Sequence, residues 1–258
     1  MKRETIVAMV VSIVLLLPAM LTGCANVAPS STGGSSLSGG GREPGLALER
    51  LGSFEAVEEA AMEDVALAVE ALAGEYEEIM ADVASYDAYL ENVDRIEAFY
   101  EKAVEDTARL CLVLRERSAN YAALALRSDA SGDAAYDSLE GLYDSIYEDA
   151  FERVYDEIYD GIFDDMYDSL YDGVLKGAYK SVPYDQWSNV VSEEYSWWSD
   201  ARSDVYSEWS DARSDVYGLW SDLRGDVYSG KDEKAQKELD RFEEDIVDDR
   251  AKLQKADE

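Results

Sequence analysis

Apolar residues recur at intervals of three and four positions through long stretches of this chain. One series runs from Phe54 to Val83, and a second runs from Val93 to Ala125. This spacing puts the apolar side chains on one face of a helix. Ser53 comes just before the first series and is a suitable N-cap. Each series therefore predicts an amphipathic helix.

Three short segments interrupt the periodicity. The phase is lost around residues 85–87, residues 128–132 are rich in small and polar residues, and Pro183 ends a third apolar stretch. Runs of β-branched residues are short and hairpin-type turn sequences are scarce, so no strands are expected. The pattern predicts an all-α fold over residues 46–258, an elongated helical bundle or antiparallel coiled coil of three to five long helices.

Residues 142–181 hold a four-residue repeat whose order is aliphatic, aromatic, acidic, then small or polar. The first tetrad is Leu142-Tyr143-Asp144-Ser145. An α-helix turns about 100° per residue, so a step of four residues overshoots one turn by roughly 40°. We therefore expect the apolar stripe to wind around the helix, so that the helix either meets neighbours on different sides along its length or wraps right-handedly around a partner.

The third position of eight consecutive tetrads is always a carboxylate. A row of acids at helical spacing is usually a solvated face, just as the aromatic row beside it is usually core. The alternative is loose binding of divalent cations. Calcium needs about six to eight oxygens around one point, whereas a helix spreads its carboxylates along its axis. The weak candidate metal ligands are Asp144, Glu148, Glu152, Asp156, Asp160, Asp164, Asp168 and Asp172.

An eleven-residue repeat occupies residues 187–230. It starts at Trp187, Trp198, Trp209 and Trp220, and the copy that begins at Trp187 is degenerate. Positions one, four and eight of each clear copy are apolar. A period of eleven corresponds to about 3.67 residues per turn and predicts straight or slightly right-handed helix packing.

An arginine follows each clear tryptophan by four residues and can stack on it. Since the turn at Pro183 is short, the two repeat regions should be antiparallel neighbours. We expect the arginines to approach the carboxylate row of the preceding helix. The alternative for the tryptophans is an exposed platform for glycans or peptides. The predicted interaction residues are Arg202, Arg213, Arg224, Trp198, Trp209 and Trp220.

Composition excludes several functions. The chain has 57 acidic and 23 basic residues, a net charge of −34, no histidine and two cysteines. Such a charge disfavours nucleic acid, which needs a basic face. The lack of histidine removes the usual general base. Cys111 lies in an apolar run and is expected to be a buried small hydrophobe.

We expect no enzymatic activity and no cofactor. The enzymatic alternative is glycoside hydrolysis by paired carboxylates, which needs an enclosed cleft. A solute-binding protein would need alternating strands and helices.

The N-terminus has a basic start, an apolar run over residues 6–20, and the sequence Leu21-Thr22-Gly23-Cys24. The run is shorter than the roughly 20 residues of a membrane-spanning helix. This layout resembles the signal peptide of a bacterial lipoprotein. The resemblance implies that residues 1–23 are removed and that Cys24 carries lipid, which would place the protein outside the cytoplasm on a bacterial cell membrane.

Residues 24–45 are rich in glycine and serine and should form a flexible tether, roughly 25 Å from end to end. The negative charge disfavours contact with anionic lipid, so the membrane is expected to be a partner only through the Cys24 lipid. The function expected is structural or protein-interaction, with a protein, a cationic partner or a second copy of the chain as candidate partners. The alternative is a binder of divalent cations or cationic ligands.

Overall fold

The computed structural model describes residues 50–127 and 132–256. The described core lies entirely within one compact unit, Gly45–Glu258. Residues 45–258 therefore contain the whole of that core. The expected signal peptide, Cys24 and tether lie outside the described residues. Every regular element among the described residues is helical, so the predicted all-α bundle is confirmed.

The first two helices begin and end where the apolar periodicity changes. Helix α2 spans Phe54–Asp82 and α3 spans Tyr86–Arg127. The hydroxyl of Ser53 accepts the N–H of Ala56, and the hydroxyl of Ser85 accepts the N–H of Ala88. Each serine satisfies a main-chain donor that the first turn of a helix leaves free. The predicted N-cap at Ser53 and the break near residue 85 are both confirmed.

The tetrads form one continuous helical rod, residues 132–178, which we call the tetrad helix. Its central part alternates between π-helical and α-helical hydrogen bonding. Its segments in order are α4 (Gly132–Gly141), η2 (Leu142–Ala150), α5 (Phe151–Val154), η3 (Tyr155–Ile162), α6 (Phe163–Leu170), η4 (Tyr171–Leu175) and α7 (Lys176–Ala178), where each η segment is π-helical.

The expectation that the apolar stripe winds around this helix is wrong. The first residue of every tetrad is buried, at 8% exposure or less, from Leu142 to Ala178. A π-turn joins residues i and i+5 and so takes up more residues than the 3.6 of an α-turn. Alternating the two kinds of turn brings the mean close to four residues per turn. The backbone adapts to the sequence repeat, and one stripe faces the core along the whole helix.

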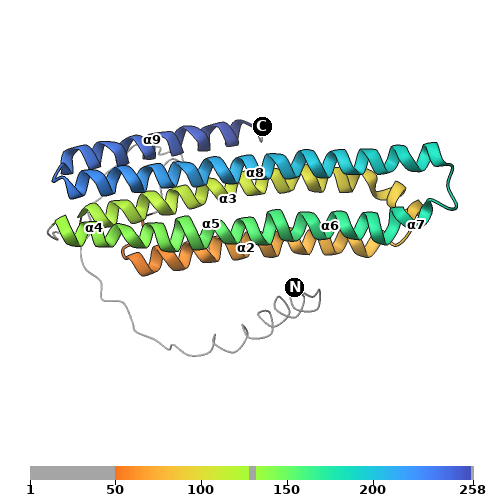
Figure 1. Ribbon diagram of the computed structural model, residues 1–258, viewed down its shortest axis with the longest axis horizontal. Coiled ribbons are helices and arrows are strands. Elements are labelled where there is room, and N and C mark those ends of the chain that lie inside the picture. The colour runs from red at the N-terminus through yellow and green to blue at the C-terminus, as the bar shows by residue number, and fades with distance from the viewer. Residues whose placement is uncertain (1–49, 128–131, 257–258) are drawn as a thin grey trace, which may run out of the picture. The chain divides into compact units, whose positions relative to one another are not determined.

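Two further helices complete the unit: α8 (Tyr184–Tyr228) and α9 (Asp232–Ala256). Helices α2, α3, α8 and the tetrad helix form a four-helix bundle. In it α3 packs against α2 and α8, and the tetrad helix also packs against both of these helices. Helix α9 lies outside this bundle on α3 and α8 and stops part of the way along α8 (Figure 1).

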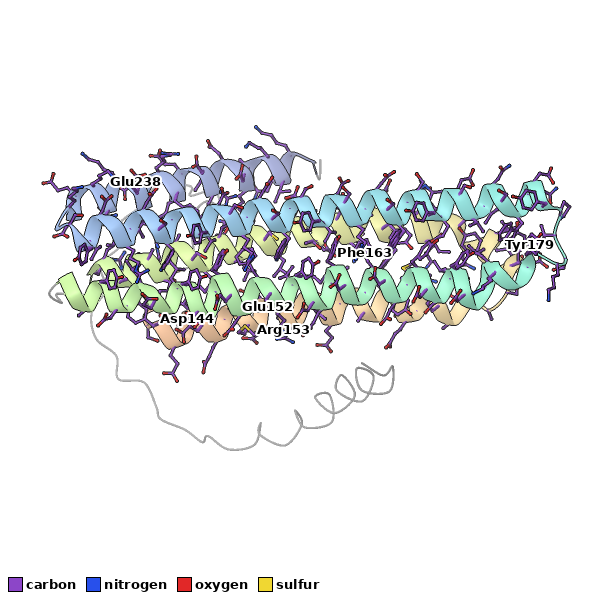
Figure 2. The ribbon with its side chains drawn as sticks, in the orientation of Figure 1. Asp144, Glu152, Arg153, Phe163, Tyr179 and Glu238 are labelled. Carbon is purple, nitrogen blue, oxygen red and sulfur yellow. The ribbon has the colours of Figure 1, made fainter. Side chains whose placement is uncertain are left out.

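The core contains aromatic and aliphatic side chains from all of these helices. Figure 2 shows the sticks of Phe163, which is fully buried, on the same helix as the exposed Asp144 and Glu152. Cys111 is buried as expected, and burial raises the pKa of its thiol to about 12. A thiol of that kind stays protonated and unreactive. Within the described residues, no helix is long and apolar enough to cross a membrane.

Candidate functional site

The most regular feature of the molecule is the interface between α8 and the tetrad helix. Three tryptophan side chains of α8 donate their indole N–H to main-chain carbonyl oxygens of the tetrad helix. The distance from the indole nitrogen to the carbonyl oxygen is 2.8 Å from Trp187 to Leu175, 3.1 Å from Trp198 to Phe163 and 2.7 Å from Trp209 to Phe151. A carbonyl has two lone pairs and can accept an indole as well as a helical N–H.

The donors recur every eleven residues and the acceptors every twelve. Eleven residues of α-helix complete about three turns. Twelve residues of the tetrad helix are three tetrads, and each tetrad is one turn because its first residue always faces the core. The two repeats therefore advance by the same number of turns, and antiparallel copies stay in register. The π-turns make this match possible.

Each of the three arginines lies beside the tryptophan that precedes it by four residues. Each guanidinium lies over the ring of a tetrad-helix tyrosine and near its own tryptophan. The guanidinium carbon is 4.0 Å from the ring centre of Tyr159 for Arg202 and 4.2 Å from that of Tyr147 for Arg213. For Arg224 the corresponding distance to Tyr136 is 4.3 Å. Each contact of this kind is worth about 0.5–2 kcal/mol, depending on desolvation.

The arginines differ in how they meet carboxylates. Arg202 pairs with Asp160 and Asp164, each at 3.2 Å, and Arg224 pairs with Glu140 at 2.6 Å. The expected approach to the acidic row holds for Arg202, whereas Arg224 pairs instead with Glu140, which precedes the eight residues of that row. Arg213 pairs with no carboxylate among the described residues. Its Nε instead donates to the carbonyl of Tyr147 at 3.4 Å.

The end of the interface near α4 departs from the twelve-residue spacing. Tyr136 precedes Tyr147 by eleven residues, because α4 is a regular α-helix. There the indole N–H of Trp220 is buried without a hydrogen-bond partner, although Tyr143 packs against its ring at 4.6 Å. At this end the arginine stack continues, whereas the indole hydrogen bond does not form.

The tryptophans are half-buried and face the tetrad helix, so they do not form an exposed platform. The exposed rings belong to tyrosines of the same eleven-residue repeat. Tyr195, Tyr206 and Tyr217 are 52%, 44% and 45% exposed. They lie against tetrad-helix tyrosines, as in the pair of Tyr206 and Tyr159 with ring centres 5.6 Å apart. Tyrosine rings thus cover the outer edge of the interface.

The eight candidate metal ligands lie along one solvated side of the tetrad helix. All are exposed except Asp164, which is half-buried. Burial raises the pKa of Asp164, while the nearby Arg202 guanidinium opposes this rise. Asp172 pairs with Lys176 at 2.8 Å. Nowhere in the described part of the chain do three or more carboxylate, thiol or imidazole groups converge to hold a metal ion.

A second polar site lies inside the bundle. Glu194 of α8 is fully buried and accepts hydrogen bonds from Tyr89 at 2.8 Å and Tyr100 at 2.7 Å, both on α3. Among the residues that the structure describes, no cation pairs with it. Burial raises the pKa of its carboxyl, and the two hydroxyl donors partly offset this rise. Burial next to Glu194 also raises the pKa values of both tyrosines.

Sequence reasoning missed Glu194, although the repeat contains a signal for it. Glu194 is position eight of the degenerate copy, where the three clear copies have Val205, Val216 and Val227. All three valines are buried. A glutamate at a position that the repeat reserves for a core valine predicts a buried carboxylate. Its partners on α3 could not be predicted, because they come from a distant part of the chain.

The enzymatic alternative needs two carboxylates in one enclosed site. Among the described residues the buried carboxylates are Glu194 and Asp226. Both are on α8, and 32 residues of α-helix separate them by roughly 48 Å. Asp226 is also paired with Lys234 at 2.9 Å. These two groups cannot act together on one glycosidic bond.

The protein is an all-α bundle in which two helices with repeats of matching pitch are joined by indole hydrogen bonds and arginine stacks. In comparisons with known proteins, no family model matches the chain, and no curated protein or solved structure is significantly similar to it. The function must therefore be argued from the chain's own residues.

Proposed function

We propose that this protein is a lipid-anchored bacterial cell-envelope protein with a structural or protein-interaction role. The observation that supports a structural role is the matched interface of α8 and the tetrad helix. Its indole hydrogen bonds and arginine stacks recur along both helices, so bending or sliding would break several at once. Such an interface suits a stiff body that presents its surface at a set distance from the membrane.

The acidic surface supports the interaction role. A net charge of −34 keeps the body away from anionic lipid headgroups and attracts basic partners. The anchor in this proposal is the lipid on Cys24, and residues 25–45 are the tether. Anchoring at one cysteine leaves the surface of the bundle accessible to other envelope components.

The anchor can be tested by expressing the full-length chain in a bacterium supplied with a clickable palmitate analogue. We expect the wild-type protein to be labelled and to sediment with membranes. The Cys24→Ser variant should lose the label, and any of it that still sediments with membranes should be uncleaved precursor. The Cys111→Ala variant is the matched control and should keep both the label and the membrane association, because Cys111 is buried in the bundle. Labelling that survives in the Cys24→Ser variant would contradict the proposal.

A second candidate function is binding of divalent cations or cationic ligands. It is favoured by the row of exposed carboxylates on the tetrad helix, whereas the lack of a converging cluster in the described residues argues for weak, non-selective binding. Calorimetry with calcium and with a polycation separates the two roles. Saturable heat with calcium at a defined stoichiometry would favour this candidate over a scaffold.

A further inference from the structure

The surface between α3 and α8 is covered by α9 along only part of its length. Helix α9 packs there through Leu239, Phe242 and Ile246, all of which are buried. Figure 1 shows that α9 ends while α3 and α8 continue. Beyond that end the same surface continues as an open groove of about 530 Å³. We call it the α3/α8 groove.

The floor of the α3/α8 groove is apolar. Tyr100 and Val104 of α3 and Trp197 and Ala201 of α8 line it. Trp197 is the one tryptophan outside the eleven-residue series of Trp187, Trp198, Trp209 and Trp220, and it is half-buried. It occupies position eleven of its copy, and the same position two copies later is Leu219.

Leu219 occupies position eleven of the repeat on a part of α8 that α9 covers. It is buried, and it lines a cleft together with Phe242 of α9. In the intervening copy position eleven is Glu208, which is exposed and lines a cleft with Leu253 of α9. At both residues, position eleven lies on the side of α8 next to α9. Trp197 has an aromatic ring at the equivalent place, where α9 does not reach. Aromatic rings in such half-buried positions are common anchors of protein interfaces.

The rim of the groove is strongly acidic. Five carboxylates surround the apolar floor: Glu97, Glu101, Glu105, Asp200 and Asp204. Glu105 is paired with Arg109 at 3.4 Å, and the other four have no cationic partner within the described residues. In the described part of the chain, no basic residue lines the groove. This charge pattern complements a ligand that is both apolar and positively charged.

The last turns of α9 show how such a ligand is held on the same surface. There Leu253 packs against the core, Arg250 pairs with Glu116 of α3, and Arg115 of α3 pairs with Asp249 at 2.7 Å. A helix thus sits on α3 and α8 with apolar residues inward and charged residues pairing across the edge. The uncovered groove continues this established interface, and the charged residues that line it within the described ranges are all carboxylates.

We propose that the α3/α8 groove binds a basic amphipathic helix of a partner protein. The α3 residues that line it, from Glu97 to Glu105, cover roughly 12 Å of helix, enough for about two turns of a partner. In such a partner an apolar stripe would pack on the floor of the groove, and lysine or arginine on both flanks of the stripe would pair with the rim carboxylates. A second copy of this chain fits poorly, because its net charge of −34 repels the same rim. The inference rests on the protein-interaction role proposed above and names the site and the class of partner.

The test uses residues 45–258 and fluorescently labelled synthetic peptides at physiological ionic strength. The probe is an 18-residue leucine–lysine peptide with its leucines on one helical face. A scrambled peptide of the same composition and a leucine–glutamate peptide serve as controls. We expect saturable one-to-one binding of the amphipathic peptide by fluorescence anisotropy and about tenfold weaker binding of the scrambled one, because only an apolar stripe can fill the floor. The acidic peptide should not bind.

Two triple variants locate the site. The rim variant Glu101→Lys/Asp200→Lys/Asp204→Lys should weaken binding by about tenfold or more. The control variant Glu59→Lys/Glu63→Lys/Glu70→Lys makes the same change of net charge at exposed residues of α2 and should weaken binding about twofold or less. Circular dichroism verifies that both variants remain folded. Equal losses in the two variants, or equal binding of the scrambled peptide, would show that net charge alone attracts the peptide and would overturn the proposal.

Sedimentation velocity tests the other occupant. A concentration-dependent dimer that the rim variant abolishes would assign the groove to a second copy and would also overturn the proposal. These measurements need no lipid, so their failure leaves the anchoring test at Cys24 unaffected. Conversely, loss of the anchor would not alter peptide binding in solution.

Discussion

The indole N–H of Trp209 donates to the carbonyl oxygen of Phe151 at 2.7 Å, and it joins two helices whose repeats have different lengths. The equivalent N–H of Trp220, one repeat later, is buried and has no partner. Both tryptophans are half-buried, and both pack on a tetrad-helix tyrosine, Tyr155 and Tyr143 respectively. Comparing the two tryptophans therefore separates the contribution of the hydrogen bond to stability from that of the packing of the ring.

Changing Trp209 to Phe should destabilise the protein more than changing Trp220 to Phe. Both variants lose similar ring area, but only the first loses a hydrogen bond, which is worth about 0.5–1.5 kcal/mol. We therefore expect the free energies of unfolding of the variants to differ by about that amount. Urea unfolding followed by far-ultraviolet circular dichroism measures it without relying on tryptophan emission. Equal losses would mean that the indole bonds do not hold the register.

Reversing the charge of Arg202 should cost more stability than reversing that of Arg213, and the excess should depend on salt. Glu at position 202 would face Asp160 and Asp164, whereas position 213 has no carboxylate partner among the described residues. Both variants lose a stack on tyrosine. Thermal unfolding of Arg202→Glu and Arg213→Glu at low and high salt makes the comparison. The gap in melting temperature should narrow at high salt, because salt screens exposed charges.

Changing Glu194 to Val restores the residue that the clear repeats have at this position. Alone it should destabilise the protein, because two buried tyrosine hydroxyls lose their acceptor, at about 1–3 kcal/mol each. The triple variant Glu194→Val/Tyr89→Phe/Tyr100→Phe removes every member of the polar site and should recover most of this loss. A triple variant no more stable than Glu194→Val would show that the hydroxyls have other partners.

The wild-type protein should gain stability as the pH falls toward 5, and Glu194 should contribute to this gain. Because burial raises the pKa of Glu194, the folded state binds its proton more readily than the unfolded state. Its full contribution to stability is present below the unfolded pKa of about 4.3 and is lost as the pH rises through the folded pKa. Asp164, Glu208 and Asp215 have raised pKa values and act in the same direction.

The Glu194→Gln variant separates this contribution from the others, since the remaining acids titrate alike in both proteins. Around the buried site the neighbouring titratable groups are Tyr89 and Tyr100 from α3, Tyr167 from α6 and Glu193 from α8 itself. Melting temperatures at several pH values should show a smaller dependence on pH in the variant. An identical dependence would contradict a raised pKa at Glu194.

Alanine at Gly141 and alanine at Gly74 should have opposite effects. A Cβ at residue 141 would lie 1.9 Å from the hydroxyl oxygen of Tyr121, a buried ring packed on Phe54, so overpacking should cost about 1–3 kcal/mol. A Cβ at residue 74 meets no atom within 4 Å, so alanine there should stabilise α2 by about 0.5–1 kcal/mol. Urea unfolding of both variants measures whether each substitution lowers or raises the free energy of unfolding.

The helices and their breaks could be predicted from the chain because they depend on local spacing. The N-cap at Ser53, the end of α3 near residue 127, the burial of Cys111 and the antiparallel pairing across Pro183 all follow from neighbours within a few turns. The same local reasoning placed Arg202 near the acidic row.

The prediction for the tetrads failed because it assumed one helical geometry. In an α-helix, residues at four-residue intervals drift around the helix axis. The tetrad helix, however, contacts the core of the bundle on one side only. Burying Ile146, Ile158 and the other first residues stabilises the fold more than the π-turns cost, so the backbone changes its hydrogen bonding instead.

Periodicity within the chain was sufficient to place the helices, the two repeats and their antiparallel pairing across Pro183. Three features depended on packing between distant segments: the twelve-to-eleven register, the burial of Glu194 between Tyr89 and Tyr100, and the groove beyond the end of α9. Sequence spacing acts over one or two turns, whereas these features arise where residues far apart in the chain must share one core.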